Sequence, residues 1–569
     1  MTASAISLDV AEVQALLARI APLITKADHE CLTSLVGTLL EVTRLARQRG
    51  ATIVRLRRML GQTSSEKTAN VVGAKGAAAP TSDGSPTASG QDEPVPDEPP
   101  RGEPKGDPAN DTGGAKEDND KPRRKGHGRI PGSAYASESI TVPHPTLGTG
   151  QHCPACAHGT LYAMKEPASC VRVFGQAPLV ALRWDCACLR CSGCGHVFTA
   201  PLPEQARGPK YSESAASMMI VLRYGMGIPL NRLETMQRLL GVPVPASTQW
   251  EVARDHVQEV LPVYEVLVSL AANAPLVHND DTYVRILELM GKRRSELIDA
   301  GALDLPDRTG LFTTGIVART AAGPIALFAS GRQHGGENLA DLLDRRDPAL
   351  APPIQMCDGL DRNLPGEHAV VLANCLAHGR RHIVDEVGNH PELCAHLLHE
   401  IGKVFANDAK CRKGGVTGEA RLAFHQRESR PVMAGLRAWI EALFADKRVE
   451  PNSGLGGALR YLLKRWEALT LFLRVADAPI DNNLSERSLK HAIRQRRASL
   501  FYRSKNGALV GDVYTALIVT TQLHRGDPFR YLTALFTNYK AVAAAPKDWL
   551  PWNYQDTLAR LDTRHAHAA

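Results

Sequence analysis

Three acidic positions have sequence settings that suit metal-dependent chemistry. Asp280 and Asp281 come where an apolar run turns acidic, so one of them is expected at the head of a strand. Asp358 stands alone at the end of a short apolar run, directly before a glycine. Glu486 falls on the first turns of an expected helix that any of residues 481–483 could cap. Each acid alone is more typical of a surface charge or a helix cap, so the hypothesis depends on the set.

Three carboxylates from separate segments match the needs of phosphodiester chemistry. Two Mg²⁺ ions about 3.5–4 Å apart can activate a water and stabilise the leaving alkoxide. Such hard cations prefer carboxylate oxygens as ligands. The segment after Glu486 is basic and could bind the flanking phosphates of a nucleic acid. Its cationic residues are Arg487, Lys490, Arg494, Arg496 and Arg497.

Two C-x-x-C pairs predict a structural zinc site. Cys153 and Cys156 form one pair, and Cys191 and Cys194 form the other. Two such knuckles supply the four thiolates of a closed tetrahedral site, which stabilises a fold and leaves no position for chemistry. Cys188 forms a competing C-x-x-C with Cys191, but the glycine within the later knuckle favours Cys191 and Cys194.

A helix–turn–helix pattern precedes the acidic segments. Residues 230–240 and the segment that starts at Ser247 are separated by a Gly-Val-Pro-Val-Pro turn. Ser247 could cap the second helix, whose early residues Thr248 and Gln249 would then face a DNA groove. Many helical pairs look like this, so the pattern by itself is weak.

Composition and charge separate the chain into a basic body and an acidic linker. Residues 68–120 hold 11 acidic and 4 basic side chains and almost no large apolar ones, which predicts disorder. The whole chain carries a net charge of +7, so the remainder carries +14. That balance suits a polyanionic partner. Residues 121–129 end the linker with five cationic side chains, which could track phosphates or simply be solvated.

The expected elements indicate an α/β multidomain chain. A leucine-rich seam near residues 32–60 predicts a dimerising coiled coil, or else an amphipathic helix packed on its own chain. Short β-branched runs predict a sheet, and the region around it reads as helical. The expected strands are 283–287, 315–319, 325–328 and 369–372.

The resulting domain organisation has six parts. They are a helical, coiled-coil-like dimerisation region (1–67), an acidic linker with a basic end (68–129), a zinc-binding module (130–205), a helix-turn-helix-like DNA-binding domain (206–268), a catalytic domain (269–540) with a helical insertion at about 388–475, and a C-terminal tail (541–569).

The chain resembles the insertion-sequence 66 family of transposases over nearly its whole length outside the linker. The most specific match is Asp481-Asn-Asn-Leu-Ser-Glu-Arg487, which continues through Leu500-Phe501-Tyr-Arg-Ser504. Further matches, in the family's order, are Leu56–Leu60 with Ser65–Lys67, Gly126–Arg129, the two C-x-x-C pairs, His278–Thr282, Asp358-Gly359 and Cys375-Leu-Ala-His378-Gly-Arg-Arg381.

This resemblance implies an RNase H-like catalytic core that carries a DDE triad. It assigns Asp280 as the first acid, Asp358 as the second and Glu486 as the third, with Asp281 where the family usually has Glu. The intervals are 78 and 128 residues, and the longer one implies the helical insertion. Cleavage at terminal inverted repeats, strand transfer and small accessory proteins of the same element are implied as well.

Two rival functions use the same features differently. A non-catalytic DNA-binding regulator would need only the zinc and helix-turn-helix parts. A structure-specific nuclease would share the Mg²⁺ chemistry without strand transfer.

The N-terminus lacks the pattern of a signal peptide, and no run of 18 or more apolar residues predicts a membrane span. We therefore expect a cytoplasmic, nucleoid-associated protein that forms homo-oligomers.

Overall fold

The computed structural model describes residues 177–568, except 191, 193, 195, 196 and 303–306, and residues 145–163, except 153 and 157. Six single residues near the N-terminus are also described: 19, 20, 22, 25, 29 and 33. The predicted dimerisation helix, apart from those six residues, and the acidic linker lie outside the described residues. The chain divides into two compact units, and one of them contains residues 178–569.

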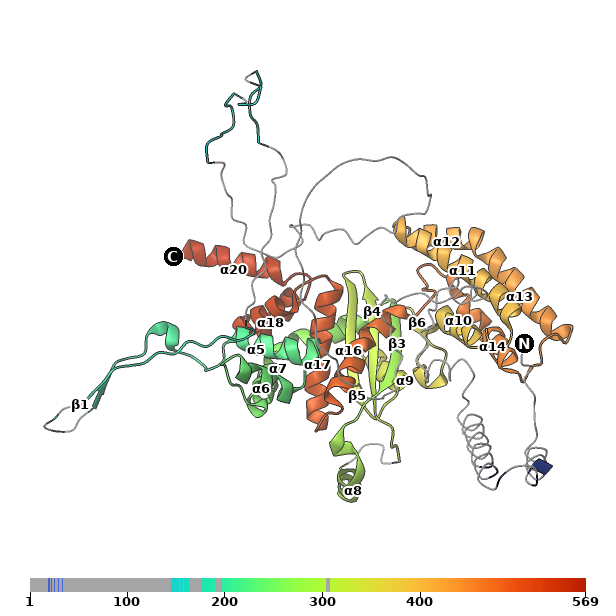
Figure 1. Cartoon of the computed structure of the whole chain (residues 1–569), viewed down its shortest axis with the longest axis horizontal. Helices are drawn as coiled ribbons and strands as arrows, with labels where there is room; N and C mark the ends of the chain where they lie inside the picture. Colours follow the sequence, from blue (N-terminus) through green and yellow to red (C-terminus); the bar gives the residue numbers. More distant parts are fainter. Residues whose placement is uncertain are drawn as a thin grey trace. The chain divides into compact units, whose positions relative to one another are not determined.

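A mixed five-stranded sheet lies at the centre of the unit that contains residues 178–569 (Figure 1). Its order is β5-β4-β3-β6-β7. Strands β3, β4 and β5 are antiparallel neighbours, whereas β6 and β7 run parallel to β3. The strands are β3 (Leu276–Tyr283), β4 (Phe312–Thr320), β5 (Gly323–Gly331), β6 (Ile354–Cys357) and β7 (Val371–Asn374).

Three of the four predicted strands correspond to strands of this sheet, whereas the fourth, 283–287, overlaps β3 only at Tyr283. The residues after Tyr283 leave the sheet, because β3 ends there and a 3-10 turn follows at Leu287–Leu289. Asp280 and Asp281 therefore lie in the second half of a strand and not at its head. The β-branched signal failed here because the middle of β3 is His-Asn-Asp-Asp, polar residues that are depleted in ordinary strands.

Helices on both sides of the central strands complete one large core. α7 (Ala246–Ala272), the sheet, α17 (Lys505–Leu523) and α18 (Pro528–Thr537) all contribute buried apolar side chains to it. Two hydrogen bonds from the backbone of β5 hold α17 against this strand. Ala326 N donates to Thr520 Oγ1, and Ser330 N donates to the carboxylate of Asp512. The other helices of this part are α5 (Glu213–Ile220), a π-helical turn (Val221–Gly225), α6 (Leu230–Leu239), α8 (Gly291–Asp299), α9 (Gly335–Leu343), α19 (Tyr539–Ala544) and α20 (Tyr554–Ala568).

A second core is built almost wholly from the helices between β7 and residue 480. Leu397 and Ile401 of one helix pack with Leu436 and Ile440 of another, at the helical spacing of an amphipathic face. The region predicted to be a helical insertion is accordingly helical. Its helices are α10 (Leu376–Asp385), α11 (Pro391–Lys413), α12 (Gly418–Glu428), α13 (Arg430–Ala445), α14 (Gly454–Lys464) and α15 (Trp466–Leu469).

The helix–turn–helix pattern exists, but its details differ from the prediction. α6 and α7 flank the turn, and α7 begins at Ala246, one residue before the predicted cap Ser247. The carboxylate of Glu234 on α6 accepts the backbone N–H of Ala246 instead. Gln249 is buried and donates to Val244 O, so it supports the turn and does not face a groove. Thr248 is half-buried.

The last helix before α17 lies directly on the sheet. α16 (Asn483–Ser499) contacts β3 and β4, and Ser485 Oγ donates to Gly315 O of β4. A Cβ atom at Gly315 would lie 2.9 Å from two side-chain carbons of Leu489. The missing side chain at Gly315 is therefore what lets α16 approach the strands.

Two further features complete the description. β1 (Cys188–Arg190) and β2 (Val197–Thr199) form a small antiparallel hairpin. Within the described part of the chain, none of the helices combines the length and the apolar character needed to span a bilayer.

We predict that Gly315→Ala destabilises the protein by about 1–3 kcal/mol, the usual cost of overpacking, because its methyl group would meet Leu489. Gly331→Ala is the matched control, since Gly331 ends the neighbouring strand and has open space at that position. Urea-induced unfolding should show a lower midpoint for Gly315→Ala only. Equal midpoints for the two variants would contradict the close approach of α16.

Candidate active site

The alternation of side chains along β3 sends its polar residues to opposite faces of the sheet. His278 Nδ1 lies 3.1 Å from Asn482 Oδ1, and Arg496 donates to Thr282 Oγ1, so this face meets α16. Asn279 and Asp281 lie on the opposite face. Asp280 lies two residues from both His278 and Thr282 along the strand, so its side chain points to the same face, toward α16.

The register of the parallel pair β3–β6 brings two of the predicted acids side by side. His278 pairs with Met356, an offset of 78 residues, which equals the interval between Asp280 and Asp358. Two residues further along both segments, Asp280 and Asp358 are therefore neighbours on the same side. Asp358 directly follows β6, which ends at Cys357.

Glu486 completes a cluster of three carboxylates. Burial, together with the charge of Asp358 and a smaller contribution from Glu486, raises the pKa of Asp280 to about 7. Asp280 is thus a half-buried acid whose pKa responds to both other carboxylates. The three acids predicted from the sequence lie together, although they come from β3, the end of β6 and the first turn of α16.

Asp358 is held by its own loop and by the helical insertion. Its Oδ1 accepts hydrogen bonds from Leu360 N at 3.0 Å and Asn363 Nδ2 at 2.7 Å. Tyr461 on α14 donates its hydroxyl to Asp358 O. Arg465 donates to the carbonyl of Gly359, a residue whose φ of 82° is unfavourable for other residue types.

A buried amide cluster supports the Asp358 loop from below. Asn363 O accepts from Asn279 Nδ2 at 2.9 Å and from Gln355 Nε2 at 2.6 Å. Gln355 Nε2 also donates to Asn279 Oδ1. Sequence analysis missed these three amides. Their signal is polar side chains inside or just after strands, where burial requires hydrogen-bond partners.

α16 is anchored at its start by Asn482. The Asn482 side chain lies against His278 and donates to Asn279 O, and its backbone N–H points to Cys375 Sγ at 3.2 Å. Burial lowers the pKa of His278 to about 4, so this histidine is neutral. Asp481 Oδ1 accepts the backbone N–H of Asn483, the first residue of α16. Asn482 thus fixes the helix on which Glu486 stands.

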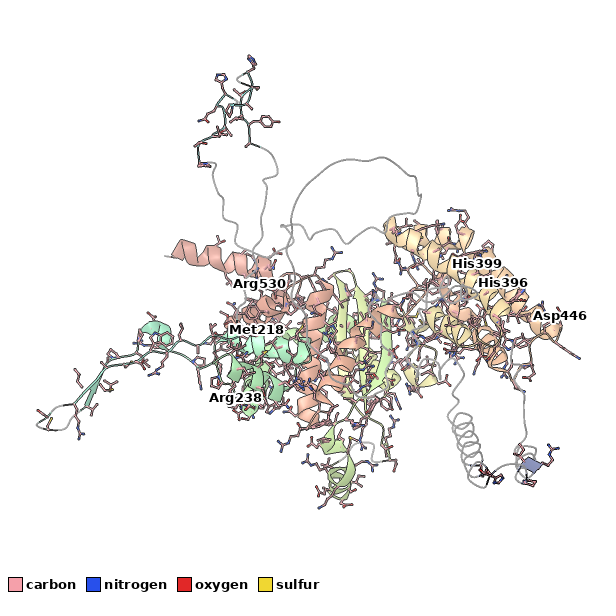
Figure 2. The ribbon with its side chains drawn as sticks, in the orientation of Figure 1. Met218, Arg238, His396, His399, Asp446 and Arg530 are labelled. Atoms are coloured by element: carbon pink, nitrogen blue, oxygen red, sulfur yellow. The ribbon has the colours of Figure 1, made fainter. Side chains whose placement is uncertain are left out.

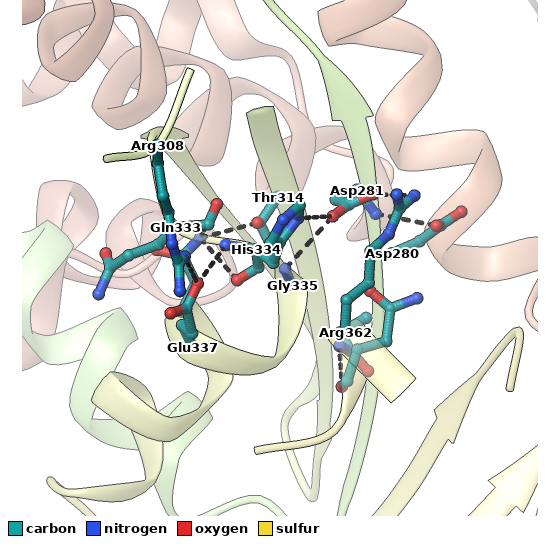
Figure 3. A network of polar contacts seen from close by, with 12 residues as sticks. Asp280, Asp281, Arg308, Thr314, Gln333, His334, Gly335, Glu337 and Arg362 are labelled. Atoms are coloured by element: carbon teal, nitrogen blue, oxygen red, sulfur yellow. Dashed lines mark hydrogen bonds and ion pairs between the residues drawn. The ribbon is translucent and has the colours of Figure 1, made fainter. Parts of the chain in front are cut away.

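Asp281 belongs to a different network on the other face of β3. Its carboxylate accepts from Arg362 at 2.9 Å and lies 3.2 Å from His334 Nδ1 at the start of α9 (Figure 3). Its side chain is only 1% exposed. The network continues through Glu337, which pairs with Arg308 and accepts His334 N–H. The geometry therefore distinguishes the two adjacent acids, which the residues alone could not do.

Comparison with known proteins identifies the family. Residues 209–509, more than half of the chain, match the family described as Transposase IS66 family. The chain belongs to the IS66 transposase family.

The IS66 match includes all three clustered acids and the whole of α16. Two similar proteins come from Sinorhizobium fredii (strain NBRC 101917 / NGR234) and are described as uncharacterized. Protein y4jD is 25% identical, over 70% of this chain and 78% of its own length. Protein y4hP is 23% identical, over 65% of this chain and 67% of its own length.

The exposed face of α16 in this IS66 transposase-family chain is basic. Arg487, Lys490, Arg494 and Arg497 are exposed, at a spacing that places them along one side of the helix. Arg496 differs, because it donates to Thr282 Oγ1 and Tyr283 O and lies over the Tyr283 ring. Arg496 therefore braces the end of β3.

Two of the four cysteines of the predicted zinc site lie among the described residues. Cys156 and Cys194 are exposed, whereas Cys153 and Cys191 lie outside the described residues. Cys194 lies in the turn between β1 and β2, a position typical of a zinc knuckle. The four-cysteine zinc site stays a prediction.

The carboxylate cluster suits a divalent cation. Three carboxylates crowd around a buried position, which is unfavourable unless one holds a proton or a cation is bound. Glu486 Oε1 is buried and lacks a hydrogen-bond partner within the described chain. Oxygen donors of this kind are those that Mg²⁺ and Mn²⁺ take in proteins.

We predict that divalent-cation binding weakens as the pH falls below about 7, because the cation must displace the proton of Asp280. Electron paramagnetic resonance with Mn²⁺ should show binding about fivefold weaker at pH 6 than at pH 7, and little change from pH 7.5 to pH 8.5. Asp280→Asn, which cannot titrate, should lose this dependence. Equal Mn²⁺ affinity of the wild type at pH 6 and pH 8 would contradict the assignment.

Proposed function

We propose that this chain cuts DNA at the ends of a mobile element and joins the freed ends to a target. In this proposal Asp280, Asp358 and Glu486 hold two Mg²⁺ ions in an RNase H-like core. The observation that carries it is the convergence of Asp280 on β3 and Asp358 after β6 with Glu486 on the first turn of α16. A three-stranded meander followed by two parallel strands is the sheet order expected of that core.

The chain's own residues would orient the reaction. Bound Mg²⁺ would lower the pKa of an attacking water and neutralise charge on the phosphate. Asp280 would give up its proton on cation binding, and Asn363 would keep the Asp358 carboxylate aligned through Oδ1. The same centre would then activate a freed 3′-hydroxyl for strand transfer.

The exposed basic residues of α16 would bind the DNA backbone beside the cluster. Arg487, Lys490 and Arg497 follow Glu486 on the same helix, so bound phosphates would lie close to the carboxylates. The module formed by the two C-x-x-C pairs and a structural Zn²⁺, together with the α6–α7 region, would bind the ends of the element. Homo-oligomerisation through residues 1–67 and accessory proteins of the same element complete the proposal.

Asp358→Asn should abolish cleavage of DNA that carries the element ends while leaving binding intact. Losing a metal ligand removes several kcal/mol of transition-state stabilisation, or about a thousandfold or more in rate. Asp361→Asn is the matched control, because Asp361 is an exposed acid in the same loop. Cleavage is followed on labelled DNA with Mg²⁺, and binding by gel shift. Full cleavage by Asp358→Asn would contradict the proposal.

The same assay, supplied with target DNA, separates the rival functions. Joined products support a transposase. Cleavage without joining would favour a structure-specific nuclease, and binding without any Mg²⁺-dependent cut would favour a regulator.

Lys490→Ala should weaken DNA binding uniformly across sequences and reduce the slope of log K against log salt by about 1, because one phosphate contact is lost. Lys540→Ala is the control, since Lys540 is exposed on α19, away from α16 in the sequence. Fluorescence anisotropy at several salt concentrations measures both. An unchanged slope for Lys490→Ala would exclude α16 as a phosphate-binding surface.

A further inference from the structure

Three potential metal ligands of different chemistry meet beside the carboxylate cluster. Cys375 and His378 belong to the start of α10, and Glu486 belongs to the first turn of α16. One ligand atom from each lies within 4.8 Å of the other two. In Figure 1, α16 lies over the sheet, and α10 lies among the helices to the right of the sheet. The proposed Mg²⁺ chemistry uses Glu486 and leaves the thiol and the imidazole without a role.

The atoms that face one another here do not satisfy each other. His378 Nδ1 lies 3.6 Å from Glu486 Oε1, which is too long for a hydrogen bond. Both atoms are buried, and neither has a hydrogen-bond partner among the described residues. Buried polar atoms normally have partners. A bound ion would explain this pair, because ligand atoms around tetrahedral zinc stand about 3.3–3.7 Å apart.

The cysteine is prepared for coordination by its surroundings. Cys375 Sγ is fully buried and lies 3.2 Å from the backbone N–H of Asn482. Backbone N–H groups that point at a sulfur are the kind of outer contacts that orient metal-bound ligands. Cys375 also stands at the N-terminal end of α10, where the helix dipole favours a thiolate, but burial raises the pKa of the free thiol to about 12, so the thiolate requires a bound cation.

We propose that Cys375, His378 and Glu486 form a zinc site that is distinct from the four-cysteine site. Thiolate, imidazole and carboxylate are all ligands of Zn²⁺, and a thiolate is a poor ligand for Mg²⁺. Binding releases the thiol proton to solvent and leaves a fourth position for water. Because the ion takes Glu486, bound zinc inhibits Mg²⁺-dependent DNA cleavage, a consequence that rests on the proposed function.

Metal stoichiometry tests the site without reference to activity. Full-length wild-type protein should bind one more equivalent of Zn²⁺ than Cys375→Ser or His378→Gln, whereas zinc at the other cysteines is the same in all three. Binding of Co²⁺ should likewise show thiolate-to-metal absorption that is reduced in Cys375→Ser. Losing a direct ligand should weaken binding at least about a hundredfold, since outer contacts alone account for about 10–100-fold.

Cys394→Ser is the matched control, because Cys394 is equally buried, on α11 of the helical insertion. It should bind zinc like the wild type. His378→Gln guards against misfolding as an explanation, because His378 is partly exposed and glutamine is of similar size. Equal zinc binding by wild type and both site variants, or the same loss in Cys394→Ser, would overturn the proposal.

Cleavage assays test the consequence. Added Zn²⁺ should inhibit wild type and Cys394→Ser in the presence of Mg²⁺, and the fraction of each variant's own activity that survives should be larger for Cys375→Ser. Equal inhibition of all variants would overturn the inhibitory role. A wild type that binds the extra zinc but never cleaves DNA would instead contradict the proposed function, so the two failures are distinguishable.

Discussion

Repulsion among three partly buried carboxylates is the constraint around which this structure is arranged. Asp280 lies next to Asp358 and near Glu486, and burial, followed by the charge of Asp358, raises its pKa to about 7. Groups so placed separate unless neighbouring contacts hold them. The sheet register, the amide cluster and the anchored helix all serve to keep the three acids together, in a family whose members are transposases.

Each acid is held by a different kind of contact. Asp280 is fixed by its position in a central strand with neighbours on both sides. Asp358 depends on Asn363 and on Tyr461, so the helical insertion is tied to the cluster. The position of Glu486 depends on how closely α16 packs on the sheet, and the lack of a side chain at Gly315 allows that close packing. In Figure 2, His396, His399 and Asp446 mark the helical insertion.

Much of this arrangement could be predicted from sequence, and the limits have physical causes. The three acids, the helical insertion and most strands were predictable from motifs and periodicity. β3 was not, because its polar residues hide the strand signal. Ser247 and Gln249 were misjudged because Glu234, distant in sequence, supplies the helix-start contact and the glutamine turns inward. The partners of Asp281, such as Arg362, are long-range contacts that no local pattern reveals.

The central claim is that Asp280, Asp358 and Glu486 form one divalent-cation centre. Fe²⁺ bound there, in the presence of ascorbate and peroxide, should cut the polypeptide next to its ligands. The account predicts cuts near all three positions in the wild-type protein, which Mg²⁺ suppresses together and which Asp280→Asn weakens together. Cuts near only one of the acids, or cuts that excess Mg²⁺ does not suppress, would contradict it.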